Sequence, residues 1–355
     1  LSELPARLSL LLVATGERFP EAPRTARFKL LSASGASLTT LDGLQKVTAD
    51  SGRLAGSQLT DLAAVSSMGF TDLYTNLSAG VDVSPLGELT SLRTVDLGQR
   101  SPASLAPLCA LPHLESLSLN YAGQKDLTGL AGCTTLTELK LRANDVVDLT
   151  PLRKLAALRS LDLSANKLVD VAPLGELTAL RSLDLSSNEI TDISALRTLA
   201  DLREIDVDYN EITDLSPLGN ASGLTSLSAT WNPVKTLGAP GSLKNLELLD
   251  VATRGRLTTL DALLGTTRLT QLKLHGNLIS DLTPLTSLPD DATIDLRGNR
   301  VHDFSPLTGW AGTLLATGQG AVLPEAKQGR PFPVRILDHH GKPLTASPQL
   351  TAHYS

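Results

Sequence analysis

Aromatic residues are scarce in this 355-residue chain. Phenylalanine, tryptophan and tyrosine make up only 3% of the residues, whereas 41% are hydrophobic. Aliphatic side chains, chiefly leucine, must therefore build the interior. The chain is also long for a single compact core. This composition favours a fold that repeats one small apolar layer many times over an ordinary globular enzyme.

Concentrated charge of one sign and long apolar runs are missing as well. The formal net charge is -6, and acidic and basic residues are scattered along the chain. No lysine- or arginine-rich block is present that would follow a phosphate backbone, which argues against nucleic-acid binding. No apolar stretch approaches the roughly 18–20 residues that span a bilayer, so we expect no direct membrane insertion.

What the chain does have is a 22-residue repeat. LRSLDLSANKLVDVAPLGELTA starts at Leu158, LRSLDLSSNEITDISALRTLAD at Leu180 and LREIDVDYNEITDLSPLGNASG at Leu202. Further units begin near Phe70, Leu92, Leu114, Leu136, Leu224, Leu246, Leu269 and Asp291, with fainter ones in residues 37–69. This period and leucine spacing identify a leucine-rich repeat.

Each position of the unit, counted as slots from its first leucine, has a physical role. Leucines at slots four and six, such as Leu161 and Leu163, alternate with polar residues at slots three, five and seven, which predicts a strand. The return leg, with Pro151, Leu152 and Leu155, is too short for a full α-helix and predicts 3₁₀ or extended structure. The fold class is therefore a leucine-rich-repeat solenoid, a right-handed curved horseshoe with a parallel sheet on its concave face and a short 3₁₀ or extended convex side.

Two polar slots resemble ligand sets but suit structural roles. Slot nine holds an asparagine, whose amide can satisfy the backbone groups of neighbouring turns. Its copies are Asn144, Asn166, Asn188, Asn210, Asn232, Asn277 and Asn299. Slot thirteen holds an aspartate just before a Ser/Thr-Pro-Leu segment, which favours turn capping over calcium binding. Its copies are Asp148, Asp170, Asp192, Asp214, Asp281 and Asp303.

The two ends of the chain depart from the repeat. Leucines recur at Leu1, Leu4, Leu8 and Leu11. That helical spacing favours an amphipathic helix over a residual signal-peptide core, so residues 1–36 are predicted to form an N-terminal helical cap. Residues 37–309 hold the repeats. After Leu307 the pattern fails, and short β-like runs at 321–323 and 334–337 predict that residues 310–355 begin an incomplete immunoglobulin-like β module.

The unit resembles that of the internalin family of Gram-positive surface proteins. The asparagine, the following I-T-D-I/L segment and the P-L step all match, as in NEITDLSPL at 210–218. The tail ATGQGAVLPEAKQGRPFPVRILDHHGKPL at 316–344 resembles the start of the immunoglobulin-like module that follows internalin repeats. The resemblance implies a secreted or wall-attached module that binds a protein, often a host receptor, through the concave sheet. The acidic residues usual in the cap are not apparent, so no calcium site is carried over.

Residue patterns for catalysis are not evident. The six histidines are His113, His275, His302, His339, His340 and His353, and they are scattered without zinc-like partners. No nucleophile elbow, phosphate loop or Cys–His pair appears. We therefore predict no enzyme activity, no metal and no cofactor. Cys109 and Cys133 lie about one repeat apart, which leaves open a disulfide between adjacent coils or two unrelated thiols.

The predicted binding surface is the outward-facing side of the strands. Tyr209 and Trp231 occupy slot eight of neighbouring units, and interface hot spots favour tyrosine and tryptophan. The alternative is that either ring packs over a neighbouring coil. The remaining candidates share slots five and seven: Asp206, Asp208, Asp162, Asp184, Tyr74, Lys140, Arg142, Lys273 and His275. The aspartates suit either a solvated charged stripe or a groove for a basic partner, and replacing Asp184 should be near neutral for stability.

The predicted function is therefore an extracellular bacterial module, monomeric, that holds a partner protein on its concave sheet. Two alternatives remain. Leucine-rich repeats also serve as intracellular scaffolds or regulators, and a solenoid can be a structural or glycan-binding spacer in the cell wall. The irregular coils from Ala229 to Leu269, which contain one inserted residue, predict a bend or a protruding loop beside Trp231.

Overall fold

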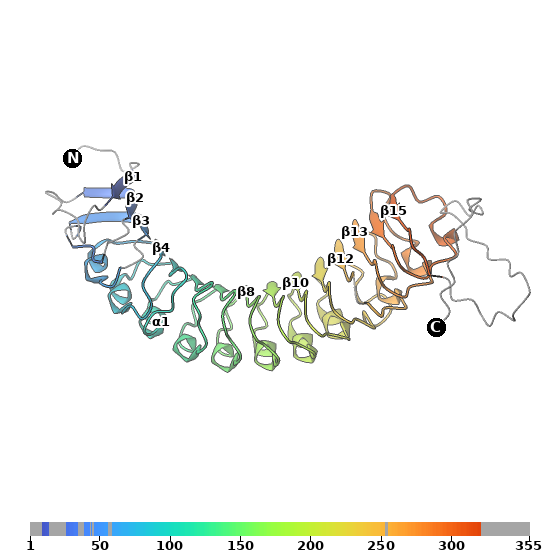
Figure 1. The fold of residues 1–355 in the computed structure, drawn as a ribbon, viewed down its shortest axis with the longest axis horizontal. Coiled ribbons are helices and arrows are strands. Elements are labelled where there is room, and N and C mark those ends of the chain that lie inside the picture. The colour runs from blue at the N-terminus through green and yellow to red at the C-terminus, as the bar shows by residue number, and fades with distance from the viewer. Residues whose placement is uncertain are drawn as a thin grey trace, which may run out of the picture. The chain divides into compact units, whose positions relative to one another are not determined.

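The computed structural model describes residues 9–13, 26–34, 39–42, 44, 46–55, 59–252 and 255–320. The chain divides into two compact units, described here separately. Unit 1 is residues 1–190 with 194–202, and unit 2 is residues 191–193 with 203–355. In each unit, successive coils stack side by side, with a strand on one side and a short helical turn on the other (Figure 1).

The strands of each unit follow one another in chain order and pair in parallel. In unit 1 they are β1 (Ser9–Val13), β2 (Ala26–Ser34), β3 (Val47–Ala55), β4 (Asp72–Thr75), β5 (Thr94–Asp96), β6 (Ser116–Ser118), β7 (Glu138–Lys140), β8 (Ser160–Asp162) and β9 (Ser182–Asp184). In unit 2 they are β10 (Glu204–Asp206), β11 (Ser226–Ser228), β12 (Leu248–Asp250), β13 (Gln271–Lys273), β14 (Thr293–Asp295) and β15 (Thr313–Leu315).

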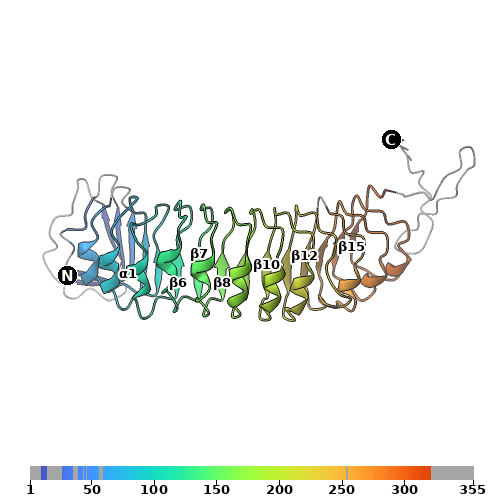
Figure 2. The same ribbon diagram turned by 90° about the horizontal axis from the view of Figure 1, so that it is seen from below.

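The return legs are mostly single 3₁₀ turns, as the short Pro-Leu segment predicts. Unit 1 has η1 (Ala63–Ser67), η2 (Ser84–Glu88), α1 (Ala106–Cys109), η3 (Thr128–Leu130), η4 (Thr150–Leu152), η5 (Ala172–Glu176) and η6 (Ser194–Thr198). Unit 2 has η7 (Ser216–Asn220), η8 (Asp261–Leu263), η9 (Thr283–Leu285) and η10 (Ser305–Leu307). Many of them carry proline in the first turn, where its fixed φ suits the helix start. Figure 2 shows these turns in a row along each unit.

The predicted strand register is confirmed. Leu161 and Leu163 are buried, and so are their equivalents one coil later, whereas Asp162 and Asp184 are partly exposed on the opposite face of the sheet. Each coil therefore contributes a layer of aliphatic side chains to a continuous core. A shift of one residue would have reversed the two faces, so the map of outward-facing slots holds.

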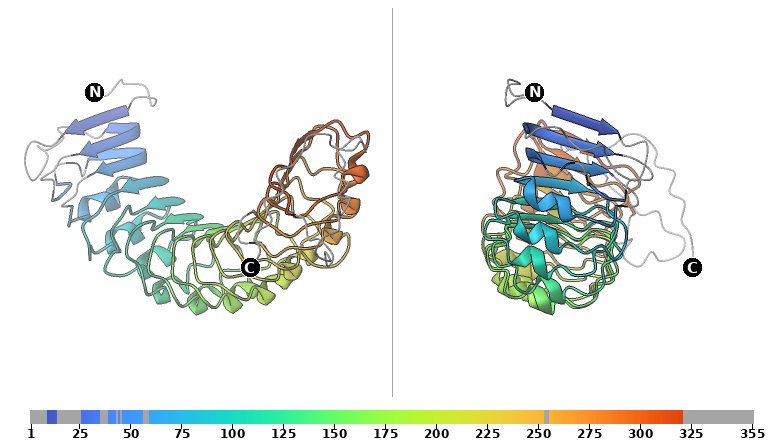
Figure 3. Two further views of the ribbon diagram at one scale, coloured as in Figure 1. Left: turned by 45° about the vertical axis from the view of Figure 1, so that its right-hand side comes forward. Right: turned by 90° about the vertical axis from the view of Figure 1, so that its left-hand side faces the viewer.

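The helical cap predicted for residues 1–36 is wrong where the structure describes that segment. Ser9–Val13 forms β1 and pairs in parallel with β2, which in turn pairs with β3 (Figure 3). A short apolar run suits a helix and a buried strand equally well by periodicity alone. Here the backbone groups of this run pair with those of β2, a partner that lies outside the run itself.

The C-terminal limit of the repeats also differs from the prediction. β15 lies in the segment assigned to the immunoglobulin-like module and instead pairs with β14 as a further coil. Gln319 takes the place of the slot-nine asparagine, with its Nε2 donating to Leu296 O at 2.8 Å and its Oε1 accepting from Val301 N at 3.0 Å. The coil pattern thus continues to residue 320 rather than ending at 309. The immunoglobulin-like runs at 321–323 and 334–337 lie outside the described residues.

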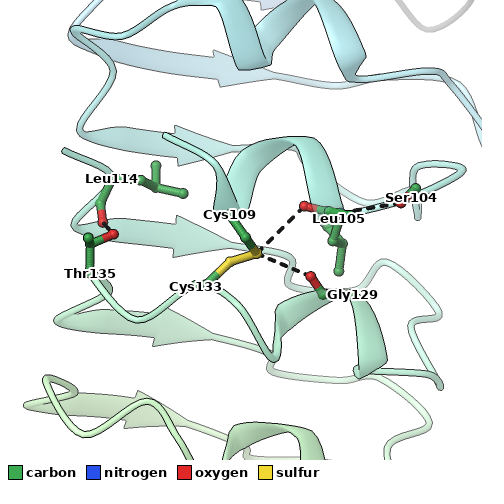
Figure 4. Close-up of a disulfide and its surroundings, with 8 residues drawn as sticks. Ser104, Leu105, Cys109, Leu114, Gly129, Cys133 and Thr135 are labelled. Atoms are coloured by element: carbon green, nitrogen blue, oxygen red, sulfur yellow. Dashed lines mark hydrogen bonds between the residues drawn. A yellow bond between two sulfur atoms is a disulfide. The ribbon is translucent and has the colours of Figure 1, made fainter. Parts of the chain in front are cut away.

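The two cysteines form a disulfide between adjacent coils. Cys109 ends α1, Cys133 follows η3 one coil later, and the sulfur atoms are bonded (Figure 4). The alternative of two unrelated thiols is therefore excluded.

Candidate partner-binding surface

The slot-nine asparagines fix the end of each strand. Asn166 Nδ2 donates to Leu163 O of its own coil and to Leu141 O of the preceding coil, both at 2.9 Å. Its Oδ1 accepts from Val146 N at 3.0 Å. Equivalent bonds are made by Asn144, Asn188, Asn232, Asn277 and Asn299. The structural role predicted for these asparagines is confirmed, and it places slot eight immediately before a rigid anchor.

Slot eight adopts the left-handed backbone conformation in coil after coil. Its residues are Tyr121, Ala143, Ala165, Ser187, Tyr209 and Trp231, with φ between 53° and 59°, and further on Gly276 and Gly298, with φ of 74° and 68°. This conformation costs a residue with a Cβ roughly 1–2 kcal/mol, so glycine is the residue that it favours. A large aromatic ring at slot eight is therefore not explained by backbone requirements.

Tyr209 and Trp231 stack on each other across neighbouring coils of unit 2. Their ring centroids lie 5.9 Å apart and the planes differ by 13°. The rings nevertheless stay 56% and 39% exposed. Each ring therefore packs on a neighbouring coil, as the alternative predicted, but its partner there is the other ring. The pair leaves aromatic surface open to solvent beyond the ends of β10 and β11. A stacked pair of this kind contributes about 0.5–1.5 kcal/mol beyond its buried area.

The slot-five aspartates have a role that the sequence did not reveal. Asp162 Oδ1 accepts from the backbone N–H of Ser164 at 2.9 Å and from its hydroxyl at 2.6 Å. Asp184 does the same for Ser186, at 2.9 and 2.7 Å. Each carboxylate therefore caps the backbone just after its own strand. The view of these residues as a solvated stripe whose replacement is neutral is incomplete, because removing the carboxylate leaves a donor without its acceptor.

Two aspartates beside the aromatic pair make similar bonds. Asp206 Oδ1 accepts from Asp208 N at 2.8 Å. Asp208 Oδ1 accepts from the Ser228 hydroxyl and from Thr230 N, both at 2.6 Å, and so joins its coil to the next one. Unit 2 thus brings together four of the predicted residues, with two carboxylates held in place next to the stacked rings.

The other predicted residues of unit 1 are engaged locally. The Arg53 guanidinium lies 5.8 Å from the centre of the Tyr74 ring, and Lys140 Nζ lies 2.9 Å from Glu138 Oε1. The hydroxyl of Ser116 holds the pKa of Glu138 below its usual range, helped by Lys140. These two contacts of Tyr74 and Lys140 are separate pairs along the sheet of unit 1.

Arg142 joins two slots of unit 1. Its Nε donates to the Tyr121 hydroxyl at 3.2 Å and its Nη1 to Ser164 Oγ at 3.0 Å. The hydrogen bond to Tyr121 holds the pKa of Arg142 above its usual range. Arg142 therefore fixes the direction of the Tyr121 ring, which the sequence identified only as an isolated aromatic at slot eight.

Lys273 and His275 lie on and just after β13, two coils beyond Trp231. Lys273 Nζ lies 3.0 Å from Asp250 Oδ2, and His275 Nδ1 lies 3.4 Å from Asp295 Oδ2. The buried Asp295 is held mainly by Arg297, whose Nε and Nη2 donate to its two oxygens at 2.9 and 2.6 Å. The hydrogen bonds from the Arg297 side chain are the main reason why the pKa of Asp295 lies below its usual range. Arg297 and Asp250 belong to these ion pairs, and the sequence analysis did not identify them as candidates.

The irregular coil of unit 2 lies directly after the aromatic pair. Asn277 Nδ2 reaches back 26 residues to Val251 O, whereas Asn166 and its equivalents reach back 25. The inserted residue therefore lies between Val251 and Leu257, whose backbone N–H donates to Asn277 Oδ1 at 3.3 Å. The predicted irregularity thus falls at the same edge of the sheet as Trp231.

The described part of the chain has many acidic side chains that could in principle bind a metal ion. There, no group of three or more histidine, cysteine, aspartate or glutamate side chains gathers closely enough to hold an ion. The slot-thirteen aspartates instead cap the return legs, as predicted: Asp148 Oδ1 accepts from Thr150 N, and Asp281 Oδ1 from Thr283 N, both at 2.8 Å. The His339–His340 pair lies outside the described residues.

Comparison with known proteins agrees with the repeat. A family model for leucine-rich repeats in two copies matches residues 178–220. Among curated protein sequences none matches the chain significantly. The structure is similar to that of an internalin (inlF) from Listeria monocytogenes, with a TM-score of 0.68 and 28% identity over 81% of this chain and 85% of that one.

Two further solved structures share the fold. The functional domain of InlJ from Listeria monocytogenes, described as including a cysteine ladder, gives a TM-score of 0.69 with 22% identity over 92% of this chain and 77% of that one. A leucine-rich-repeat protein of Leptospira interrogans gives 0.66 with 22% identity over 79% and 76%. With the slot pattern, the asparagine ladder and the likeness to inlF together, the described coils are leucine-rich repeats of the internalin type.

Proposed function

We propose that this chain is a non-enzymatic, extracellular module of a bacterial surface protein, and that a partner protein docks on the stacked rings of Tyr209 and Trp231. The observation that carries the proposal is the pair itself. Two large rings occupy left-handed positions that favour glycine, in a chain with few aromatics, and they stay exposed. Rigid, partly exposed aromatic surface of this kind is typical of the centre of protein interfaces.

The extracellular location is supported by the disulfide and by the family. The Cys109–Cys133 bond joins two coils, and disulfides persist mainly in oxidising compartments outside the cytosol. Internalins resemble this chain in fold and sequence. In the residues that the structure describes, no helix is long and apolar enough to cross a membrane. An intracellular scaffold would not need a disulfide, which makes that alternative less well supported.

The charges around the rings indicate the kind of partner. Asp206 and Asp208 lie beside the pair with their carboxylates fixed by backbone and hydroxyl donors. A partner surface that offers an apolar pocket with lysine or arginine at its rim would meet both the rings and the carboxylates. Such rim charges mainly raise the association rate, while the buried rings determine how long the complex lasts.

The test uses alanine, which slot eight already accepts at Ala143 and Ala165. Wild type, Trp231→Ala and the matched control Tyr121→Ala are used to capture proteins from the surface of host cells, and the captured protein is then titrated against each. Trp231→Ala should weaken binding by at least about 2 kcal/mol, or roughly thirtyfold. Tyr121→Ala should bind as wild type does. Equal affinity for wild type and Trp231→Ala would show that the rings only pack against each other.

A further inference from the structure

Unit 1 has a small hollow on the sheet side, where β4, β5 and β6 end. The coil that begins at Leu92 carries Gly98 at slot seven, whereas its two neighbours carry Asn76 and Asn120 there. A space of about 330 Å³, which we name the Gly98 hollow, is lined by Gly98 and by residues of the two neighbouring coils. Small-molecule sites usually have volumes of about 300–1,000 Å³, so this one suits a single ring of a larger ligand.

The backbone keeps this space open. Gly98 has a φ of 73°, and a Cβ at this position would lie 2.6 Å from Thr75 O and 3.0 Å from Asn76 Cα. A residue with a side chain would be both strained and sterically blocked by the backbone of the preceding coil, so the wall of the hollow requires glycine at this position. The hollow is therefore a fixed feature of these three coils.

The groups around the hollow can donate and accept hydrogen bonds, and one offers a flat apolar face. Its polar side chains are Thr75, Asn76, Asp96, Gln99, Ser118 and Asn120, and its ring is Tyr121. Three of these groups are held in position. Asp96 Oδ1 accepts from Gly98 N at 2.9 Å, Asn120 Oδ1 accepts from Arg142 N at 2.8 Å, and the Tyr121 hydroxyl accepts from Arg142 Nε. Asn76 and Gln99 are exposed, and Tyr121 is 53% exposed.

We propose that the Gly98 hollow binds one residue of a neutral oligosaccharide. Sugar hydroxyls donate and accept at once, and side-chain amides beside a carboxylate match both roles. The C–H face of a pyranose ring is apolar and flat enough to lie on the face of Tyr121, much as other flat rings stack on tyrosine. An apolar peptide side chain would make no use of the amides, and an anion would meet the Asp96 carboxylate.

This inference extends the proposed function to a second ligand class and a different unit of the chain. It does not depend on the aromatic pair of unit 2, because the hollow is lined only by residues of the coils that begin at Phe70, Leu92 and Leu114. Slot eight serves both sites, with Tyr121 in one and Tyr209 with Trp231 in the other. The two sites can therefore be disabled one at a time.

The experiment is a titration of the whole chain with cellotriose, maltotriose and triacetylchitotriose, followed by calorimetry or by ligand-observed NMR. At least one of these should bind saturably, and Tyr121→Ala and Gln99→Ala should each weaken that binding tenfold or more. Tyr121→Ala places alanine where Ala143 and Ala165 already adopt the same backbone, so the melting temperature should stay within a few degrees of wild type. The control Tyr209→Ala should bind the sugar as wild type does.

Three outcomes would overturn the inference: binding of none of the three sugars, equal binding by wild type and Tyr121→Ala, or stronger binding of sialyllactose than of every neutral sugar. None of them would affect the proposed protein partner, whose test uses Trp231→Ala. Conversely, loss of protein capture in Trp231→Ala with intact sugar binding would support both assignments.

Discussion

Two pairs of coils have the same backbone conformation at slot eight but carry different residues there. The first pair begins at Leu136 and Leu158, and the second begins at Leu202 and Leu224. The first two carry alanine there, with φ of 53° and 55°, and the second two carry Tyr209 and Trp231, with φ of 54° and 59°. Slot nine is asparagine in all four. The comparison teaches that a slot with the same residue in most copies holds the coils together, whereas a slot that varies on a fixed backbone is available for function.

The disulfide is the largest expected contribution on the structural side of this comparison. Replacing Cys109 and Cys133 together by serine removes a cross-link between residues 24 positions apart. The free energy of unfolding should fall by about 2–4 kcal/mol, because the unfolded chain regains the freedom of that loop. Urea unfolding of the variant, and of wild type with and without a reductant, measures the effect. Unchanged stability in all three would mean that the bond holds nothing together.

The asparagine ladder comes next. Asn188 Nδ2 donates to Leu163 O at 3.1 Å and to Leu185 O at 2.9 Å, and its Oδ1 accepts from Leu168 N at 3.0 Å. Asn188→Ala should lower the free energy of unfolding by about 1–3 kcal/mol, because it leaves buried backbone groups unpaired. The neighbouring slot-eight change Ser187→Ala is the matched control and should alter stability by much less. A reversed ranking in denaturant unfolding would contradict the division between the two slots.

The slot-five aspartates should have a smaller effect. Asp184→Ala removes the acceptor of Ser186 N and should cost about 1 kcal/mol. Asp184→Asn keeps an oxygen at the same place and should recover most of that loss. Thermal unfolding of the two variants side by side measures the difference. If alanine and asparagine are equally stable, the carboxylate has no capping role and the stripe is only a charged surface.

The smallest effect concerns acid. The Thr128 N–H holds the pKa of Asp126 below its usual range, and the Thr150 hydroxyl does so for Asp148. A carboxyl whose pKa is lower in the folded state stabilises the fold fully above its unfolded pKa of about 3.9, and that stability is lost as pH falls through the lower folded pKa. The melting temperature should therefore decrease when the pH is lowered below about 4. Asp148→Asn, which caps without titrating, should show a slightly smaller drop than wild type in scans at pH 7, 4 and 3.

Much of the fold could be predicted because each copy of the repeat can be compared with the others. The alternation around Leu161, the asparagine at slot nine and the aspartate at slot thirteen recur at a fixed spacing, so their positions predict the register and the turns. The segment of residues 1–36 occurs once. The spacing of its leucines favoured a helix, and the strand could not be predicted because it depends on pairing with β2.

The binding surfaces were harder to predict, because they depend on contacts between coils. The bond from Ser164 N to Asp162 could not be read from an aspartate in a charged row. The Gly98 hollow arises from three coils together, and the sequence shows only one glycine between two asparagines. One signal was available: Gly276 and Gly298 at slot eight indicated the left-handed backbone that makes Tyr209 and Trp231 unusual.

The most direct test of the account is a comparison of the double variant Tyr209→Ala/Trp231→Ala with wild type, in partner titration and in urea unfolding of the same samples. We predict that binding of the captured partner is lost while the free energy of unfolding falls by less than about 3 kcal/mol, since the ring stack adds only about 0.5–1.5 kcal/mol to the effect of its small buried area. Full partner binding, or a loss of more than about 3 kcal/mol of stability, would show that slot eight holds the coils together and does not carry the function.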